Sequence, residues 1–134
     1  MKKNKIIALI LAVMMVCLVA VGCGEAKQKI AVQATFSVII NGQTVIDSHT
    51  AEMKGTATSA PSVLEAVCDV LELYGIIPDY DEHSLIGANY NGVMYNTENG
   101  NAWYYTINGK DGSRASETIL QEGDTIVYIY GPIA

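Results

Sequence analysis

Two apolar runs near the C-terminal end of the chain have the patterns expected of β-strands. Residues 103–107 are aromatic or β-branched, lie between Asn99-Gly100 and Asn108-Gly109, and alternate as a half-buried strand requires. Residues 125–130 follow a turn-forming Glu-Gly-Asp and are almost all apolar or aromatic. A strand with two apolar faces is typical of an inner strand that is covered on both sides, or covered on one side and binding something on the other.

The part of the chain before these runs contains a hairpin pattern and two shorter apolar runs. The β-rich runs 35–40 and 43–48 flank Asn41-Gly42, a dipeptide preferred in two-residue hairpin turns. Residues 84–90 and 93–95 predict two short strands around a further Asn-Gly turn. Residues 49–59 are expected to form the end of the second strand and a connection. Residues 76–83 are expected to form a turn-rich acidic connection.

Residues 60–75 predict a helix. Ser62 and Glu65 have the spacing of a capping box, in which both side chains satisfy free N–H groups of the first turn, and Gly75 sits where a C-terminal cap belongs. The polar face carries Glu65, Asp69 and Glu72, and we interpret it as solvated rather than as a metal site, because no His or second carboxylate cluster completes a coordination shell. The apolar stripe consists of Val63, Leu64, Val67, Val70, Leu71 and Tyr74.

The order of these elements predicts the fold class. Two strands, one helix and then three or four strands follow one another without an internal repeat or a second core. One amphipathic helix on a mixed sheet of four to five strands is an α+β arrangement of the β-grasp type. The sequence therefore predicts a single domain over residues 34–131.

The N-terminal segment has the layout of a bacterial export signal. Three Lys residues precede an apolar run over residues 6–21, which is shorter than a comfortable membrane span. The small residues before Cys23 resemble a lipobox, which implies cleavage after residue 22 and attachment of lipid such as palmitate to Cys23. We therefore expect a signal peptide over 1–22, a spacer over 23–33 and a lipoprotein held on the extracytoplasmic face of the cell membrane; an uncleaved anchor or an ordinary secretory peptide is the alternative.

The charge of the mature chain excludes one class of partner. Without Lys2, Lys3 and Lys5, five of the eight basic residues remain against 14 acidic ones, so the net charge is near −9. Such a surface repels nucleic acid and anionic lipid headgroups. We expect no nucleic acid partner.

The sequence contains no recognisable catalytic motif. Neither a GxSxG elbow nor a phosphate-binding glycine loop occurs, so an enzyme is not expected. Cys68, the cysteine left after Cys17 and Cys23 are assigned to the N-terminal segment, lies among apolar residues and is interpreted as a core residue rather than a nucleophile. Two weak candidate cation-ligand sets are interpreted as solvated surface, and no metal is expected: Asp47, His49 and Glu52, and Asp79, Asp81, Glu82 and His83.

Aromatic residues gather in the C-terminal half of the chain. Eight Tyr and one Trp are present, and clusters of these residues on a surface suit binding faces because they give a large contact area at low entropic cost. The alternative is that half of them line the core. We expect one side of strand 103–107 to face the core and the other side to be available for binding. The aromatic residues expected to gather on this sheet and its adjoining loops are Tyr90, Tyr95, Trp103, Tyr104, Tyr105, Tyr128 and Tyr130.

Three stretches together resemble a known family. With SVLEAVCDVLELYG, NAWYYTINGK and ILQEGDTIVYIYG, the chain resembles the transcobalamin-like C-terminal domains, the β-grasp module at the C-terminus of transcobalamin and intrinsic factor. The resemblance implies this fold and a cobalamin or other corrinoid ligand, with no cofactor otherwise assigned. We expect binding of such a small amphipathic ligand by Tyr95, Trp103 and Tyr105, with Asn101 and Asn108 as hydrogen-bonding groups. The alternative function is a non-catalytic surface module for protein interaction or wall association.

Overall fold

The computed structural model describes residues 29–132, which form one helix and eight strands. The predicted signal peptide of residues 1–22 and the predicted lipidation site Cys23 lie outside the described residues. No helix within the described range has the length and apolar character needed to cross a bilayer. The elements, in order, are β1 (Ala31–Ile40), β2 (Gln43–Lys54), α2 (Val63–Leu73), β3 (Ile77–Tyr80), β4 (Leu85–Tyr90), β5 (Val93–Asn96), β6 (Asn101–Ile107), β7 (Lys110–Asp111) and β8 (Asp124–Pro132).

The main sheet has five strands in the order β2-β1-β8-β6-β7. β1 and β8 are parallel neighbours in its middle, and all other pairs are antiparallel. The two apolar runs near the C-terminus are therefore adjacent strands, in which Trp103 lies opposite Tyr130 and Tyr105 opposite Tyr128. β1 begins at Ala31, before the predicted start of the domain at residue 34.

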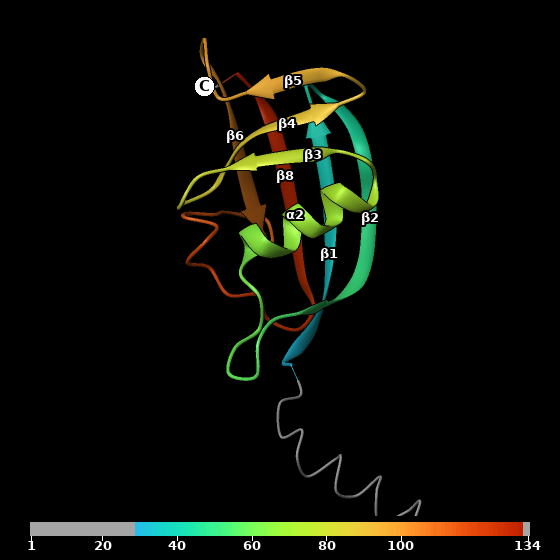
Figure 1. Ribbon diagram of the computed structural model, residues 1–134, viewed down its shortest axis with the longest axis vertical. Helices are drawn as coiled ribbons and strands as arrows, with labels where there is room; N and C mark the ends of the chain where they lie inside the picture. Colours follow the sequence, from blue (N-terminus) through green and yellow to red (C-terminus); the bar gives the residue numbers. More distant parts are fainter. Residues whose placement is uncertain (1–28, 133–134) are drawn as a thin grey trace, which may run out of the picture.

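One face of the main sheet is covered by α2 and by a second, smaller sheet (Figure 1). Alternate residues of the central strands point into this layer, such as Phe36 and Val38 of β1 and Ile126 and Tyr128 of β8, all at most 1% exposed. The alternating residues of β8 on the other face, Val127 and Ile129, are only half-buried. β8 is thus an inner strand that is covered on one face, and cover on both faces, the first of the two predicted alternatives, is not observed among residues 29–132.

The second sheet has three strands in the order β3-β4-β5. The prediction of an α+β fold with one helix on a mixed sheet is confirmed, but the strands at 84–90 and 93–95 join this separate sheet. The expectation that 76–83 is only a connection is wrong, because Ile77–Tyr80 pairs with β4 as an edge strand. Pro78 has no N–H to donate, and an edge strand is where a sheet tolerates proline.

Asn-Gly dipeptides form the tight turns, as the sequence predicts. In the β1–β2 turn Asn41 has φ 50° and Gly42 has φ 80°, the left-handed geometry that a two-residue hairpin of this kind requires. The same combination recurs at Asn91-Gly92, Asn99-Gly100 and Asn108-Gly109.

Helix α2 begins at the predicted Ser62 cap, but only half of the predicted capping box forms, because the Glu65 carboxylate is bonded to the Ser62 hydroxyl and not to a backbone N–H. The Glu65 N–H donates to Ser62 Oγ at 3.1 Å, and the Ser62 hydroxyl donates to the Glu65 carboxylate at 3.3 Å. The loop before β8 supplies two further acceptors, since the N–H groups of Val63 and Leu64 donate to carbonyls of that loop. Gly75, with φ 73°, ends the helix as predicted.

Candidate functional site

Five aromatic residues form a cluster between the main sheet and β5, and we call Tyr95, Trp103, Tyr105, Tyr128 and Tyr130 the aromatic cluster. The Trp103 ring stacks on Tyr130 with centroids 5.2 Å apart, and the Tyr105 ring stacks on Tyr128 at 5.1 Å. Tyr95 meets Tyr130 edge-on at 5.4 Å. The cross-strand register of β6 and β8 produces both stacks, because facing residues of an antiparallel pair hold their side chains side by side.

The polar ends of three of these rings hold neighbouring segments to the main sheet. Trp103 Nε1–H donates to the Tyr95 carbonyl at 2.8 Å, and the Tyr130 hydroxyl donates to the Asn96 carbonyl at 2.7 Å, so both attach β5. The Tyr105 hydroxyl donates to the Ser113 carbonyl at 2.7 Å and attaches the loop before β8. Buried Tyr and Trp usually satisfy their polar atoms in this way, which makes these contacts part of the fold.

The cluster is closed to solvent at the positions that were expected to meet a ligand. Trp103 is 7% exposed and Tyr105 is 5% exposed, so the expectation that these two rings lie on an open face is wrong. They point toward the layer that β5 and the loop before β8 cover. The available side of strand β6 is the other one, where Tyr104 is 44% exposed. Tyr95 is half-buried.

Asn108 lies in the turn after β6, and Asn101 is the first residue of β6. Asn108 has φ 52°; its Nδ2 donates to Asp124 Oδ1 at 2.9 Å, and its Oδ1 accepts the Thr125 N–H at 2.8 Å. Both ends of the Asn108 amide are thus engaged within the turn. Asn101 is half-buried at the start of β6, and its backbone N–H donates to the Glu98 carbonyl. Of the five predicted site residues, Tyr95 and Asn101 are half-buried and Asn108 is exposed, although its amide is engaged within the turn.

One buried hydroxyl in the cluster has no partner. Tyr128 is 1% exposed, and its hydroxyl makes no hydrogen bond among the described residues. Burial, with smaller contributions from Tyr105 and Cys68, raises the pKa of Tyr128 well above its ordinary value. The ring therefore stays neutral at any physiological pH.

The β4–β5 hairpin carries exposed apolar residues at the end of the small sheet. Val93 is 50% exposed and Met94 49% exposed, while Tyr90 and Tyr95 are half-buried beside them. Because Trp103 bonds to the Tyr95 carbonyl, this accessible strand is connected directly to the aromatic cluster.

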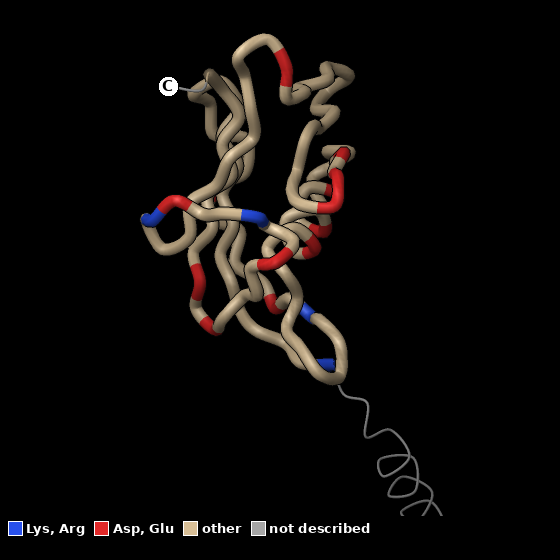
Figure 2. Tube along the Cα trace, turned by 90° about the vertical axis from the view of Figure 1, so that its left-hand side faces the viewer, with Lys and Arg blue, Asp and Glu red and all other residues tan. Residues whose placement is uncertain are grey.

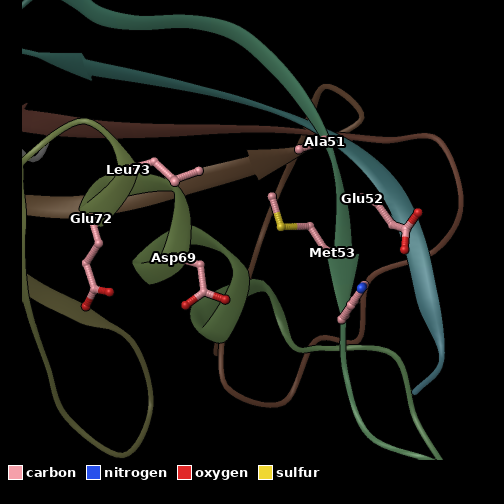
Figure 3. A pocket seen from close by; sticks show the side chains of 7 residues that line it. Ala51, Glu52, Met53, Asp69, Glu72 and Leu73 are labelled. Atoms are coloured by element: carbon pink, nitrogen blue, oxygen red, sulfur yellow. The ribbon is translucent and has the colours of Figure 1, made fainter. Parts of the chain in front are cut away.

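Grooves flank both sides of α2. The one toward β2 has a volume of about 500 Å³, and the one toward β3 about 310 Å³. Asp69 and Glu72 line both. Figure 3 shows Met53 of β2 directed toward α2, with the carboxylates of Asp69 and Glu72 on the facing helix. The groove toward β2 is lined by Ala51, Glu52, Met53, Lys54, Asp69, Glu72 and Leu73. The groove toward β3 is lined by Leu64, Glu65, Cys68, Asp69, Glu72 and Tyr80.

The end of α2 and strand β3 also have exposed apolar residues that the sequence interpretation missed. Leu73 is 69% exposed, Ile77 67% and Tyr80 58%. Tyr74, which was assigned to the apolar stripe, is 47% exposed, and its hydroxyl contacts His49 Nδ1 at 2.9 Å. A signal was present in the sequence, because Leu73 falls beside Glu72 and outside the apolar stripe.

Cys68 is buried, as predicted, at 9% exposure. Burial, followed by the charges of Glu72 and Asp69, raises the pKa of Cys68 to about 12. A thiol with that pKa is almost fully protonated at neutral pH and is a poor nucleophile.

The two weak candidate cation-ligand sets are engaged otherwise. Asp81 Oδ1 accepts the backbone N–H groups of His83 and Ser84, both at 2.8 Å, and these two bonds, Ser84 first, lower the pKa of Asp81. Asp47 accepts from the Ser48 hydroxyl. Within residues 29–132, no group of three or more His, Cys, Asp or Glu side chains is placed to hold a metal ion.

Two solved structures share this fold. A protein from Ruminococcus gnavus ATCC 29149, provisionally described as a metal binding protein, matches with a TM-score of 0.50 and 16% identity over 77% of this chain and 99% of its own. Haptocorrin in complex with Cbi matches with a TM-score of 0.54 and 12% identity over 79% of this chain. The matched part is 26% of the haptocorrin chain, so this chain corresponds to about a quarter of that protein. These likenesses show the fold alone.

Comparisons of sequence give no relative. No family model matches the chain, and no curated protein sequence matches it.

Proposed function

We propose that this chain is a non-catalytic binding lipoprotein, anchored through lipid on Cys23 at the extracytoplasmic face of the membrane, that binds a small amphipathic ligand. A corrinoid is the first candidate. The observation that carries the proposal is the fold shared with the part of haptocorrin that was matched, in a structure that contains Cbi. The resemblance of the three sequence stretches to transcobalamin-like C-terminal domains supports the same ligand class.

The accessible apolar residues of the β4–β5 hairpin are the surface that suits such a ligand. Met94 and Val93 are about half exposed, Tyr95 follows them on β5 and is half-buried, and Asn101 at the start of β6 is half-buried. An amphipathic molecule lying on this hairpin would bury apolar area, and Asn101 would supply an amide for hydrogen bonding. The fluorescence emission of Trp103 would change on ligand binding, because its indole N–H donates to the Tyr95 carbonyl of the same hairpin.

The test is a titration of the full chain, held in nanodiscs of zwitterionic lipid, with Cbi and with cobalamin. Binding is measured by equilibrium dialysis and corrinoid absorbance, and emission from Trp103, the single tryptophan, is followed in parallel. We expect saturable binding below roughly 100 μM, a free energy of about 5.5 kcal/mol. Substitution Met94→Asp should weaken it, whereas Tyr104→Ser, an exposed change on β6, should not. Absence of binding at that concentration would contradict the corrinoid proposal.

A second function, a protein-interaction module, is favoured by a different observation. The rings expected to bind a flat ligand are buried, while Leu73, Ile77 and Tyr80 are more than half exposed beside an acidic helix. Exposed apolar residues next to charged ones are typical of protein docking surfaces.

A further inference from the structure

The acidic residues near the C-terminal end of α2 interact unfavourably with the helix dipole. The C-terminal end of a helix has partial negative charge and favours basic side chains, yet the last turn of α2 has none and contains Glu72, with Asp69 one turn earlier. Within residues 29–132 neither carboxylate has an ion pair. Unfavourable local features of this kind, when no contact within the fold offsets them, are expected at surfaces that have a function.

The same side of α2 presents apolar side chains to solvent. Leu73 follows Glu72 directly and lines the groove toward β2, and Tyr80 lines the groove toward β3. Both are more than half exposed. We call Asp69, Glu72, Leu73 and Tyr80, with Met53 at the base of the larger groove, the α2 surface. It combines two carboxylates of α2 that have no ion pair among residues 29–132 with hydrophobic contact area from α2, β2 and β3, and Lys54 also lines the larger groove.

The net negative charge of the described residues indicates which class of partner suits the α2 surface. Residues 29–132 contain 13 acidic and four basic side chains, and Figure 2 shows how few basic positions interrupt the acidic ones. Anionic lipid, nucleic acid and a second copy of this chain would all be repelled. A bare metal ion lacks a set of three ligands in the described residues. A segment with Lys or Arg beside aliphatic residues matches both features of the surface.

We propose that the α2 surface docks a basic, amphipathic peptide segment of a partner protein. Aliphatic side chains of the segment would enter the grooves beside Met53, Leu73 and Tyr80, and its Lys or Arg groups would pair with Asp69 and Glu72. This inference does not rest on the ligand proposed for the β4–β5 hairpin, because the two surfaces use different residues.

The test uses the full chain in nanodiscs of zwitterionic lipid and a short fluorescein-labelled peptide with Lys and Leu on opposite helical faces. Fluorescence anisotropy measures binding, with empty nanodiscs as the blank. We expect saturable binding that weakens as salt rises, and much weaker binding of a peptide in which Ser replaces every Leu. Equal binding of the Lys/Leu and Lys/Ser peptides would overturn the proposal, as would no binding at all.

Two matched variants separate the surface from overall charge. Asp69→Asn with Glu72→Gln removes two carboxylates from the α2 surface, and Glu98→Gln with Asp111→Asn removes two exposed ones elsewhere. The first pair should weaken binding on the order of tenfold, and the second should leave it nearly unchanged. The first pair should also keep or raise the thermal midpoint, which shows that lost binding is not lost folding. Equal weakening by both pairs would overturn the proposal.

Leu73→Ser provides the apolar counterpart. Leu73 is 69% exposed, so its loss should leave the fold intact. We expect several-fold weaker peptide binding with an unchanged salt dependence. Binding equal to that of the unmodified chain would contradict the assignment of the grooves.

Discussion

The aromatic cluster and the α2 surface both concentrate large apolar side chains, but they treat their polar atoms in opposite ways. In the cluster, Trp103, Tyr105 and Tyr130 donate to backbone carbonyls of other segments and are at most 7% exposed. On the α2 surface, Asp69 and Glu72 have no ion pair among the described residues, and Leu73 is exposed. The comparison indicates that burial, more than hydrogen-bond satisfaction, distinguishes the aromatic residues that build the fold from residues available to a partner, because Tyr128 is buried although its hydroxyl has no partner among the described residues.

The largest expected effect comes from removing a ring from the cluster. Trp103→Ala should cost about 3–5 kcal/mol of folding free energy, because a buried aromatic side chain and its bond to the Tyr95 carbonyl are lost together. Leu73→Ala on the α2 surface should change stability by no more than about 0.5 kcal/mol. Urea unfolding followed by far-UV circular dichroism measures both. Similar costs at the two sites would remove the distinction.

A smaller effect is expected where the cluster meets the loop before β8. A Cβ added at Gly112 would overlap the Tyr105 ring, so Gly112→Ala must displace that ring and should cost about 1–3 kcal/mol. Gly131→Ala is the control, since a Cβ there meets nothing within 4 Å. Thermal midpoints of the two variants give the comparison. A stable Gly112→Ala variant would show that Tyr105 is less firmly held than its contacts indicate.

Two stacked tyrosines provide a finer test. Tyr105→Phe removes a hydroxyl that donates to the Ser113 carbonyl, and should cost about 1–2 kcal/mol. Tyr128→Phe removes a buried hydroxyl without a partner, and should be neutral or stabilising. Urea midpoints of both variants measure the difference. A larger loss at Tyr128 would mean that its hydroxyl has a role that the described contacts do not include.

The smallest expected effect concerns the two ends of α2. Glu72→Gln should raise stability by about 0.3–1 kcal/mol, since it removes negative charge from the C-terminal end of the helix dipole. Glu65→Gln keeps the length of the side chain but removes favourable charge from the capped first turn, and should lower stability by a similar amount. Thermal unfolding at low salt measures both. Loss of stability in Glu72→Gln would show that the carboxylate is engaged within the fold.

Local patterns in the sequence were sufficient to predict most of the framework. The Asn-Gly turns, the helix cap at Ser62 and the alternation in residues 125–130 each have a short-range physical cause. β3 was not predicted because it is four residues long, contains Pro78 and leaves Ile77 and Tyr80 exposed, so it lacks the alternation of a half-buried strand.

The candidate site was less predictable, because it depends on contacts between distant residues. Which side of β6 is buried depends on β5, which contacts Trp103, and on the loop before β8, which contacts Tyr105, and both contacts exist only in the folded chain. The Tyr130 hydroxyl meets the carbonyl of Asn96, 34 positions away. The alternation of residues in β6 correctly predicted that one side of the strand is buried and the other exposed. It contains no information on which of the two sides another segment covers.

One measurement tests the division between the two regions most directly. The full chain, labelled with ¹⁵N and held in zwitterionic nanodiscs, gives a single indole N–H signal from Trp103 and backbone signals from α2 and β3 in one spectrum. On addition of the Lys/Leu peptide, we expect signals of Asp69, Glu72 and Leu73 to move while the indole signal stays in place. Movement of the indole signal with α2 unchanged would contradict the account, because it would mean that the aromatic cluster is the peptide-binding surface.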